Sequence, residues 1–127
     1  KSTLAKKTGK LILSDDCIGL KYLNEKWYSC STPWGDISSY GNFPMEGIYF
    51  INKSNALKIK KTEKIEAVKT LFSSVCASFP KSPSENTEMI EHILSSVEQI
   101  CYRVPIYNLE FRKNDNVFDE IFKDWQL

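Results

Sequence analysis

Two adjacent carboxylates follow a short apolar run near the start of the chain. Residues 11–14 read Leu-Ile-Leu-Ser, Asp15 and Asp16 come next, and a second apolar run follows. A run this short, with Gly9 on one side and charges on the other, favours a buried strand over a helix. Carboxylates at the end of such a strand can hold a cation or accept a proton. The pair is therefore a candidate catalytic centre.

The first three residues carry a second pattern that could do chemistry. Lys1, Ser2 and Thr3 begin a helix-compatible stretch. In a Walker A loop, a lysine neutralises the β- and γ-phosphates of a nucleotide, and the hydroxyl after it ligates Mg²⁺ at the start of a helix. Lys-Ser-Thr is a common tripeptide, and the glycine-rich part of that loop is absent from this sequence. The tripeptide therefore predicts nucleotide binding only in combination with the two aspartates.

Phosphoryl transfer needs a carboxylate that anchors a metal and a base that accepts the proton of the nucleophile. Asp15 and Asp16 can divide these roles, because their mutual repulsion and the metal separate their proton affinities. The alternative interpretation is structural. An isolated Asp-Asp pair is most simply a polar kink or an Asx-turn between two strands.

The elements that must position these residues follow from hydrophobic periodicity and from turn residues. We expect an α/β fold with a mixed sheet and two long amphipathic helices on one of its faces. The polar loop from Thr32 to Asn42 carries Trp34 and Tyr40, and a loop of this length suggests binding or mobility. The expected helices span residues 3–8, about 62–79 with Thr62 as N-cap, 86–102 and 117–125. The expected strands span residues 10–14, 17–23, 27–31, 47–51 (central), 56–60 (edge) and 106–111, with a hairpin turn at 24–26.

Composition excludes several classes of function. The 127 residues are 42% hydrophobic and 26% charged, as in an ordinary globular protein. The 17 Lys and Arg residues nearly balance the 16 Asp and Glu residues, so the overall charge is too small to recruit nucleic acid. No apolar run approaches the about 20 residues that cross a bilayer, and we expect no membrane partner and no signal peptide. The four cysteines form no CxxC pair, and we interpret Cys17, Cys76 and Cys101 as small reduced core residues of a cytoplasmic protein.

The order of these features resembles the HPr kinase/phosphorylase and ATP-dependent phosphoenolpyruvate carboxykinase superfamily, and most closely its HPr-kinase-like serine kinases. The similarity runs over essentially the whole chain, although only its first two pieces are motifs with a mechanism. The segments that carry it are Lys1-Ser2-Thr3-Leu4-Ala5, Leu11-Ile12-Leu13-Ser14-Asp15-Asp16, Thr32-Pro33-Trp34-Gly35, Gly47-Ile48-Tyr49-Phe50-Ile51 and residues 104–111.

The resemblance implies a P-loop kinase core that moves the γ-phosphoryl of ATP, with Mg²⁺, to a hydroxyl on a serine peptide, a small protein or a small molecule. It implies that Lys1 contacts the phosphates, that Ser2 ligates Mg²⁺ and that Thr3 lies near the nucleotide. Asp16 is then the proton acceptor and Asp15 the carboxylate near the metal, although the two aspartates could exchange roles.

The chain departs from the family pattern at its start and after its central strand. It lacks the first strand and the glycine-rich half of the P-loop, so we expect one catalytic domain over residues 1–127 that is weak or inactive by itself and that could form a homo-oligomer through an open sheet edge. The arginine-containing signature of enzymes that phosphorylate HPr is absent, which argues against HPr as the substrate. Glu46 is the nearest counterpart there and a further candidate metal ligand.

Two alternative functions stay open. The chain could be a non-catalytic peptide-binding module derived from such a kinase, using the loop from Thr32 to Asn42. A carboxykinase-like activity on a small carboxylic acid is disfavoured, because the chain has only two arginines. Of these, Arg112 is the better candidate to stabilise a phosphate, but a surface ion pair with Glu110 or Asp115 is the simpler expectation.

Overall fold

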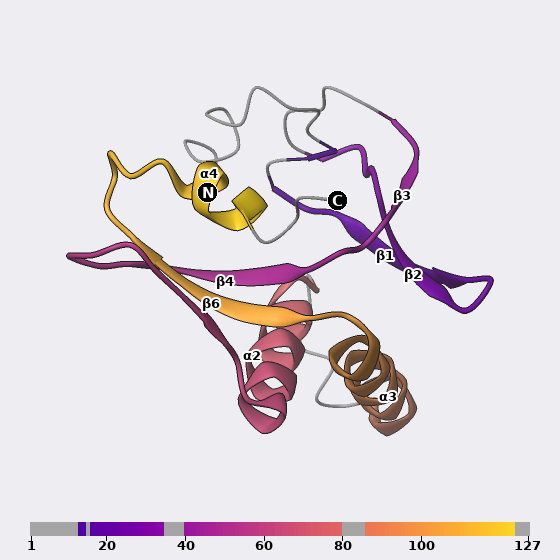
Figure 1. Ribbon diagram of the computed structural model, residues 1–127. Helices are drawn as coiled ribbons and strands as arrows, with labels where there is room; N and C mark the ends of the chain where they lie inside the picture. Colours follow the sequence, from indigo (N-terminus) through magenta and orange to yellow (C-terminus); the bar gives the residue numbers. More distant parts are fainter. Residues whose placement is uncertain (1–12, 15, 35–39, 80–85, 124–127) are drawn as a thin grey trace.

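The computed structural model describes residues 13–14, 16–34, 40–79 and 86–123. This part of the chain forms two three-stranded sheets and three helices (Figure 1). The α/β class is therefore confirmed, but the strands form two sheets rather than the single sheet that we expected. The expected helix at 3–8 and most of the strand at 10–14 lie outside the described residues, and Leu13 and Ser14 belong to no strand.

The first sheet is an antiparallel meander. Its strands are β1 (Gly19–Leu23), β2 (Lys26–Cys30) and β3 (Asn42–Pro44), paired in that order. The turn between β1 and β2 consists of Asn24 and Glu25, both with positive φ (48° and 64°), as a two-residue hairpin turn requires. The predicted hairpin is confirmed. The strand β3 was not predicted, because its three exposed residues carry no hydrophobic alternation.

The second sheet is mixed and has the order β4-β6-β5. The strands β4 (Ile48–Lys53) and β6 (Ile106–Phe111) are parallel, and β5 (Lys58–Lys61) is antiparallel to β6. Among the described strands, β6 is therefore the central one, whereas we expected residues 47–51 to be central. The strand β5 lies at an edge, as predicted.

The apolar sequence of β4 follows from the layers that cover the second sheet. The helices α2 (Lys64–Ala77) and α3 (Thr87–Arg103) lie on one side of this sheet, and α4 (Val117–Lys123) lies on the other (Figure 1). Ile48 and Phe50 pack into the core under α2 and α3, whereas Tyr49 and Ile51 pack into the core under α4. An apolar run in a strand thus indicates that both faces of the sheet are covered there. It does not indicate whether the strand has one neighbouring strand or two.

The two long helices begin differently. Asn86 caps α3, and its side chain accepts a hydrogen bond from the backbone N–H of Met89 at 3.0 Å. The expected N-cap of α2 is wrong, because Glu63 occupies that position and makes no capping hydrogen bond with its side chain. Thr62 instead extends the sheet, since its backbone N–H donates to the carbonyl of Ile106 at 2.9 Å.

The described helices include none that is long and apolar enough to cross a membrane. All four cysteines are free thiols, and each is half-buried. Cys17, Cys76 and Cys101, which we expected in the core, are thus only partly buried.

Candidate functional site

Asp16 lies in a turn that the hydroxyl of Ser14 organises. The Ser14 Oγ accepts hydrogen bonds from the backbone N–H groups of Asp16 and Cys17, each at 3.2 Å. The same hydroxyl donates a hydrogen bond to the backbone carbonyl of Trp34 at 2.6 Å. One donor and two acceptor sites are all that a serine hydroxyl offers, so this side chain is fully used.

A second side chain joins the same two segments. The hydroxyl of Thr32 donates a hydrogen bond to the backbone carbonyl of Cys17. Together with the bond from Ser14 to Trp34, this contact brings Ser14 and Cys17 next to Thr32 and Trp34. Two of the segments that carry the resemblance to the kinase superfamily are therefore neighbours in space, although 15 and 20 positions separate the bonded residues in the sequence.

The carboxylate of Asp16 is exposed. Within the described part of the chain, no group donates a hydrogen bond to it, because Ser14 supplies the acceptor that the turn needs. A polar turn is therefore present at Asp16, but Ser14 rather than an aspartate organises it, and it does not engage the Asp16 carboxylate. A carboxylate that is held on a tethered turn and left open to solvent can accept a proton or approach a cation.

The other predicted site residues lie outside the described residues. These are Lys1, Ser2, Thr3 and Asp15, so their approach to Asp16 stays a prediction. Among the residues that the structure does describe, no three His, Cys, Asp or Glu side chains gather into a metal-binding group. A magnesium site would therefore depend on the predicted ligands Ser2 and Asp15.

Glu46 does not lie near Asp16 along the hairpin. Met45, its neighbour, donates a backbone hydrogen bond to Trp27, at the start of β2. Asp16 precedes Gly19, which pairs with Cys30 at the other end of the same strand. Because a five-residue strand is roughly 15 Å long, the hairpin separates the two carboxylates, and they do not form a common metal site.

A hollow of about 710 Å³ begins one residue after Asp16. One wall consists of β1 and β2, and the other consists of α3 and the end of α2. Its lining contains no Asp, Glu, Lys or Arg, and it comprises Cys17, Ile18, Leu20, Tyr22, Trp27, Val75, Ser78, Phe79, His92, Ile93, Ser95, Ser96, Val97, Gln99 and Ile100. An uncharged chain segment or small molecule fits such a lining.

Sequence reasoning missed this hollow. The signal was a polar stripe at helical spacing, formed by His92, Ser96 and Gln99 beside the buried Ile93, Val97 and Ile100. His92 is exposed and lines the hollow. The stripe alone could not reveal the opposite wall, which comes from the first sheet.

The two arginines have different environments. The Arg112 side chain donates to the Asp115 carboxylate through Nε at 3.1 Å and through Nη2 at 2.9 Å, and this partner raises the pKa of Arg112. The simpler expectation, a surface ion pair, is therefore confirmed. Arg103 instead lies over the ring of Tyr22, with 5.4 Å between the guanidinium carbon and the ring centroid.

The expected loop after β2 presents two aromatic side chains. Trp34 is 61% exposed and Tyr40 is 79% exposed, and residues 35–39 between them lie outside the described part. Both rings are thus available for contact with a ligand.

Comparison of the chain with models of protein families, with curated proteins and with solved structures finds no match.

Proposed function

We propose that this chain is an ATP- and Mg²⁺-dependent phosphotransferase domain of the HPr-kinase-like kind, built on a P-loop kinase core. The γ-phosphoryl group leaves ADP and forms a new P–O bond with a hydroxyl of the acceptor, a serine of a peptide or small protein or a small molecule. The hydroxyl proton passes to Asp16. The proposal includes a cytoplasmic location, which the four free thiols support.

One observation carries the proposal. The exposed carboxylate of Asp16 lies on a turn that is joined to the next loop by the hydrogen bonds Ser14–Trp34 and Thr32–Cys17, and it accepts no hydrogen bond from the described residues. A general base needs this combination, because it must keep a fixed position while its lone pairs stay available to the substrate. A carboxylate whose oxygens already accepted the hydrogen bonds of its own turn would be a poor proton acceptor for the substrate.

The remaining roles are assigned to residues near the start of the chain. Lys1 contacts the phosphates, Thr3 lies near the nucleotide, and Ser2 and Asp15 hold Mg²⁺. The metal neutralises the charge of the phosphate oxygens. These assignments rest on the resemblance and on the short distance in sequence between Asp15 and Asp16.

Turnover and nucleotide binding test the proposal. ADP formation from Mg²⁺-ATP is measured with a library of serine-containing peptides as acceptor, and binding is measured with a fluorescent ATP analogue. We expect weak turnover from residues 1–127, and Asp16→Asn should lower it further by about 100-fold, which is the usual contribution of a general base. Nucleotide binding should change little, because this carboxylate acts on the acceptor. Lys1→Ala should weaken nucleotide binding by about tenfold.

The matched control is Glu91→Gln, which removes an exposed carboxylate from α3. This variant should keep the turnover of the unsubstituted chain. Equal turnover of Asp16→Asn and Glu91→Gln would contradict the role of Asp16. Nucleotide binding that is unaffected by Lys1→Ala and independent of Mg²⁺ would contradict the proposed kinase class.

A second candidate function is a peptide-binding module without catalysis. The exposed rings of Trp34 and Tyr40 favour it, because exposed aromatic side chains are common anchors of interfaces. Such a module would retain its peptide when Asp16 is replaced by Asn and lose it when Trp34 is replaced by Ala. Retained turnover in Trp34→Ala, with lost turnover in Asp16→Asn, would instead support the kinase.

A further inference from the structure

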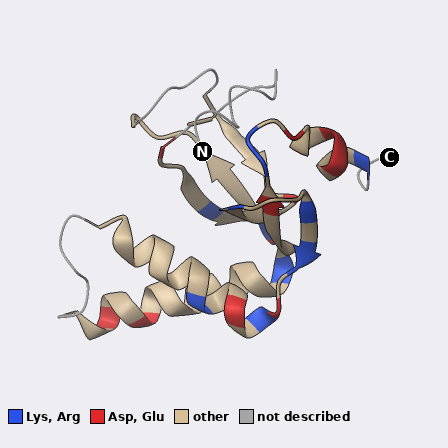
Figure 2. Cartoon of the chain, turned by 90° about the vertical axis from the view of Figure 1, so that its left-hand side faces the viewer, with Lys and Arg blue, Asp and Glu red and all other residues tan. Residues whose placement is uncertain are grey.

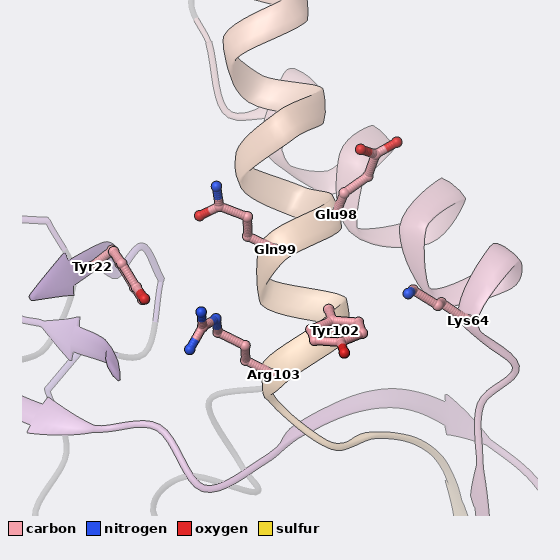
Figure 3. Close-up of a pocket in the computed structure, with 6 residues that line it drawn as sticks. All are labelled: Tyr22, Lys64, Glu98, Gln99, Tyr102 and Arg103. Atoms are coloured by element: carbon pink, nitrogen blue, oxygen red, sulfur yellow. The ribbon is translucent and has the colours of Figure 1, made fainter. Parts of the chain in front are cut away.

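Four side chains form a surface where α3 ends and α2 begins. Tyr22 comes from β1, Lys64 is the first residue of α2, and Tyr102 and Arg103 are the last residues of α3. We call this set the Tyr–Arg surface. Figure 3 shows the ring of Tyr102 between the Lys64 amine and the Arg103 guanidinium, with Tyr22 beyond the arginine. Tyr102 is 76% exposed.

Each cation of the Tyr–Arg surface is held by an aromatic ring. The Lys64 Nζ lies 4.5 Å from the centroid of the Tyr102 ring. Arg103 lies over Tyr22, and its Nη1 donates a hydrogen bond to the backbone carbonyl of Glu25 at 3.4 Å. These contacts fix the two charges, while most of the five guanidinium N–H donors stay available.

A buried residue supports the arrangement from below. The Trp27 side chain is 8% exposed, and its ring packs against Tyr22 with 5.3 Å between the centroids and 47° between the planes. Trp27, Tyr22 and Arg103 therefore form a series of contacts from the core to the surface. A guanidinium positioned in this way loses less freedom when it binds a partner.

The two cations have no carboxylate partner within the described part of the chain. The ion pairs found there join Lys69 to Glu66, Arg112 to Asp115 and Lys123 to Glu120. Basic and acidic segments alternate where β5 leads into α2 (Figure 2), and Lys61, at the end of β5, is the basic residue there that lines a hollow beside Tyr102. This side of the molecule thus offers charge to an anionic partner.

The hollows around Tyr102 show where a partner would lie. Two of them have volumes of about 390 Å³ and 320 Å³. The charged residues in their linings are Lys61, Lys64, Arg103 and a single acid, Glu98. A third hollow has as many acids as cations in its lining, Glu25 and Glu46 with Lys26 and Arg103. An anionic ligand is therefore favoured on the side of α2 and disfavoured on the side of the first hairpin.

We infer that the Tyr–Arg surface binds an acidic peptide segment. The argument is charge complementarity, together with the distribution of the two cations on either side of an exposed ring. Carboxylates spaced along a peptide can reach both cations, and its apolar groups can cover Tyr102 between them. The surface involves the end of β1 that is remote from Asp16, so the inference does not depend on the phosphotransferase proposal.

The experiment measures binding of a fluorescent, end-capped poly-glutamate peptide by anisotropy at low and at physiological ionic strength. We expect binding at low ionic strength that weakens as salt is added. The double variant Lys64→Gln/Arg103→Gln should lower the affinity by about tenfold. Tyr102→Phe should bind like the unsubstituted chain and Tyr102→Ala more weakly, because the ring rather than its hydroxyl makes the contact.

The matched control is Lys53→Gln/Lys58→Gln, which removes the same charge at the far end of the second sheet. This control should retain the affinity, and circular dichroism should give the same fold for all variants. Equal losses in both double variants would overturn the inference, since they would reflect net charge alone. Absence of binding, or tighter binding of single-stranded poly(U) than of poly-glutamate, would overturn it as well.

Discussion

At the scale of the residue, one hydroxyl decides the geometry around Asp16. Ser14 accepts two backbone N–H groups and donates to the carbonyl of Trp34, so it connects the turn to a distant segment. Each such hydrogen bond contributes about 1 kcal/mol net. A small side chain thus stabilises the turn that holds the candidate base.

Replacement of this hydroxyl is a direct test. We expect Ser14→Ala to lower the free energy of unfolding by about 1–3 kcal/mol, because up to three hydrogen bonds are lost at a partly exposed position. Chemical denaturation monitored by circular dichroism measures the change. Ser14→Thr keeps the hydroxyl and is the control. An equally stable Ser14→Ala variant would show that the turn does not depend on this side chain.

Cys101 gives a prediction for the pH dependence. Burial raises the pKa of this thiol above its ordinary value, and the nearby charge of Lys64 opposes part of the shift. A raised folded-state pKa means that the folded chain binds more protons, so the stability contribution is complete below the unfolded pKa and is lost as the pH rises through the folded value. Denaturation at increasing pH should therefore show a steeper loss for the unsubstituted chain than for Cys101→Ala. Parallel curves would contradict this.

At the scale of the element, local signals and long-range contacts compete at the helix starts. Asn86 caps α3 through its side chain, whereas Thr62 continues the sheet with its backbone and leaves its hydroxyl buried without a partner in the described part. The same kind of capping sequence therefore has different outcomes, because Thr62 is already paired to β6 when α2 begins.

Two substitutions separate these cases. Asn86→Ala should destabilise the fold by about 1 kcal/mol, since the N-terminal N–H groups of α3 lose their side-chain acceptor. Thr62→Val should leave the stability unchanged or raise it, because it removes a buried hydroxyl that forms no hydrogen bond. Urea denaturation of both variants gives the comparison. A loss for Thr62→Val as large as that for Asn86→Ala would assign the capping role to Thr62 after all.

At the scale of the whole molecule, the second sheet separates two cores. One core lies under α2 and α3 and extends to Trp27 of the first sheet, and the other lies under α4 around Leu109. Alternate residues of β4 take part in each core. Because the same strand is packed from both faces, the two cores should unfold together.

A core substitution tests this coupling. Leu109 is 1% exposed, and Leu109→Ala should lower the free energy of unfolding by about 2–5 kcal/mol. Thermal unfolding followed by tryptophan fluorescence and by far-ultraviolet circular dichroism should remain a single transition with one midpoint. Two separate midpoints would mean that the core under α4 unfolds independently.

Local patterns in the sequence determined the elements themselves. The stripe of Ile93, Val97 and Ile100 predicts α3, the short apolar-rich run from 106 to 111 after Pro105 matches β6, and Asn24 with Glu25 marks the hairpin turn. These features follow from backbone dihedral preferences and from periodicity, which act over a few residues. The pair Asp15–Asp16 was also singled out from its immediate neighbours, whereas the choice of Asp16 as the base came from the family resemblance and stays a prediction.

Only the tertiary structure decided which elements meet. The division into two sheets, the contact between Ser14 and Trp34, and the approach of Tyr22 to Arg103 all join positions far apart in the chain. Such contacts are selected by packing and hydrogen bonding in the folded molecule, and no short-range pattern encodes their partners. The acid could therefore be named from the sequence, whereas the surface that would bind an acidic peptide could not.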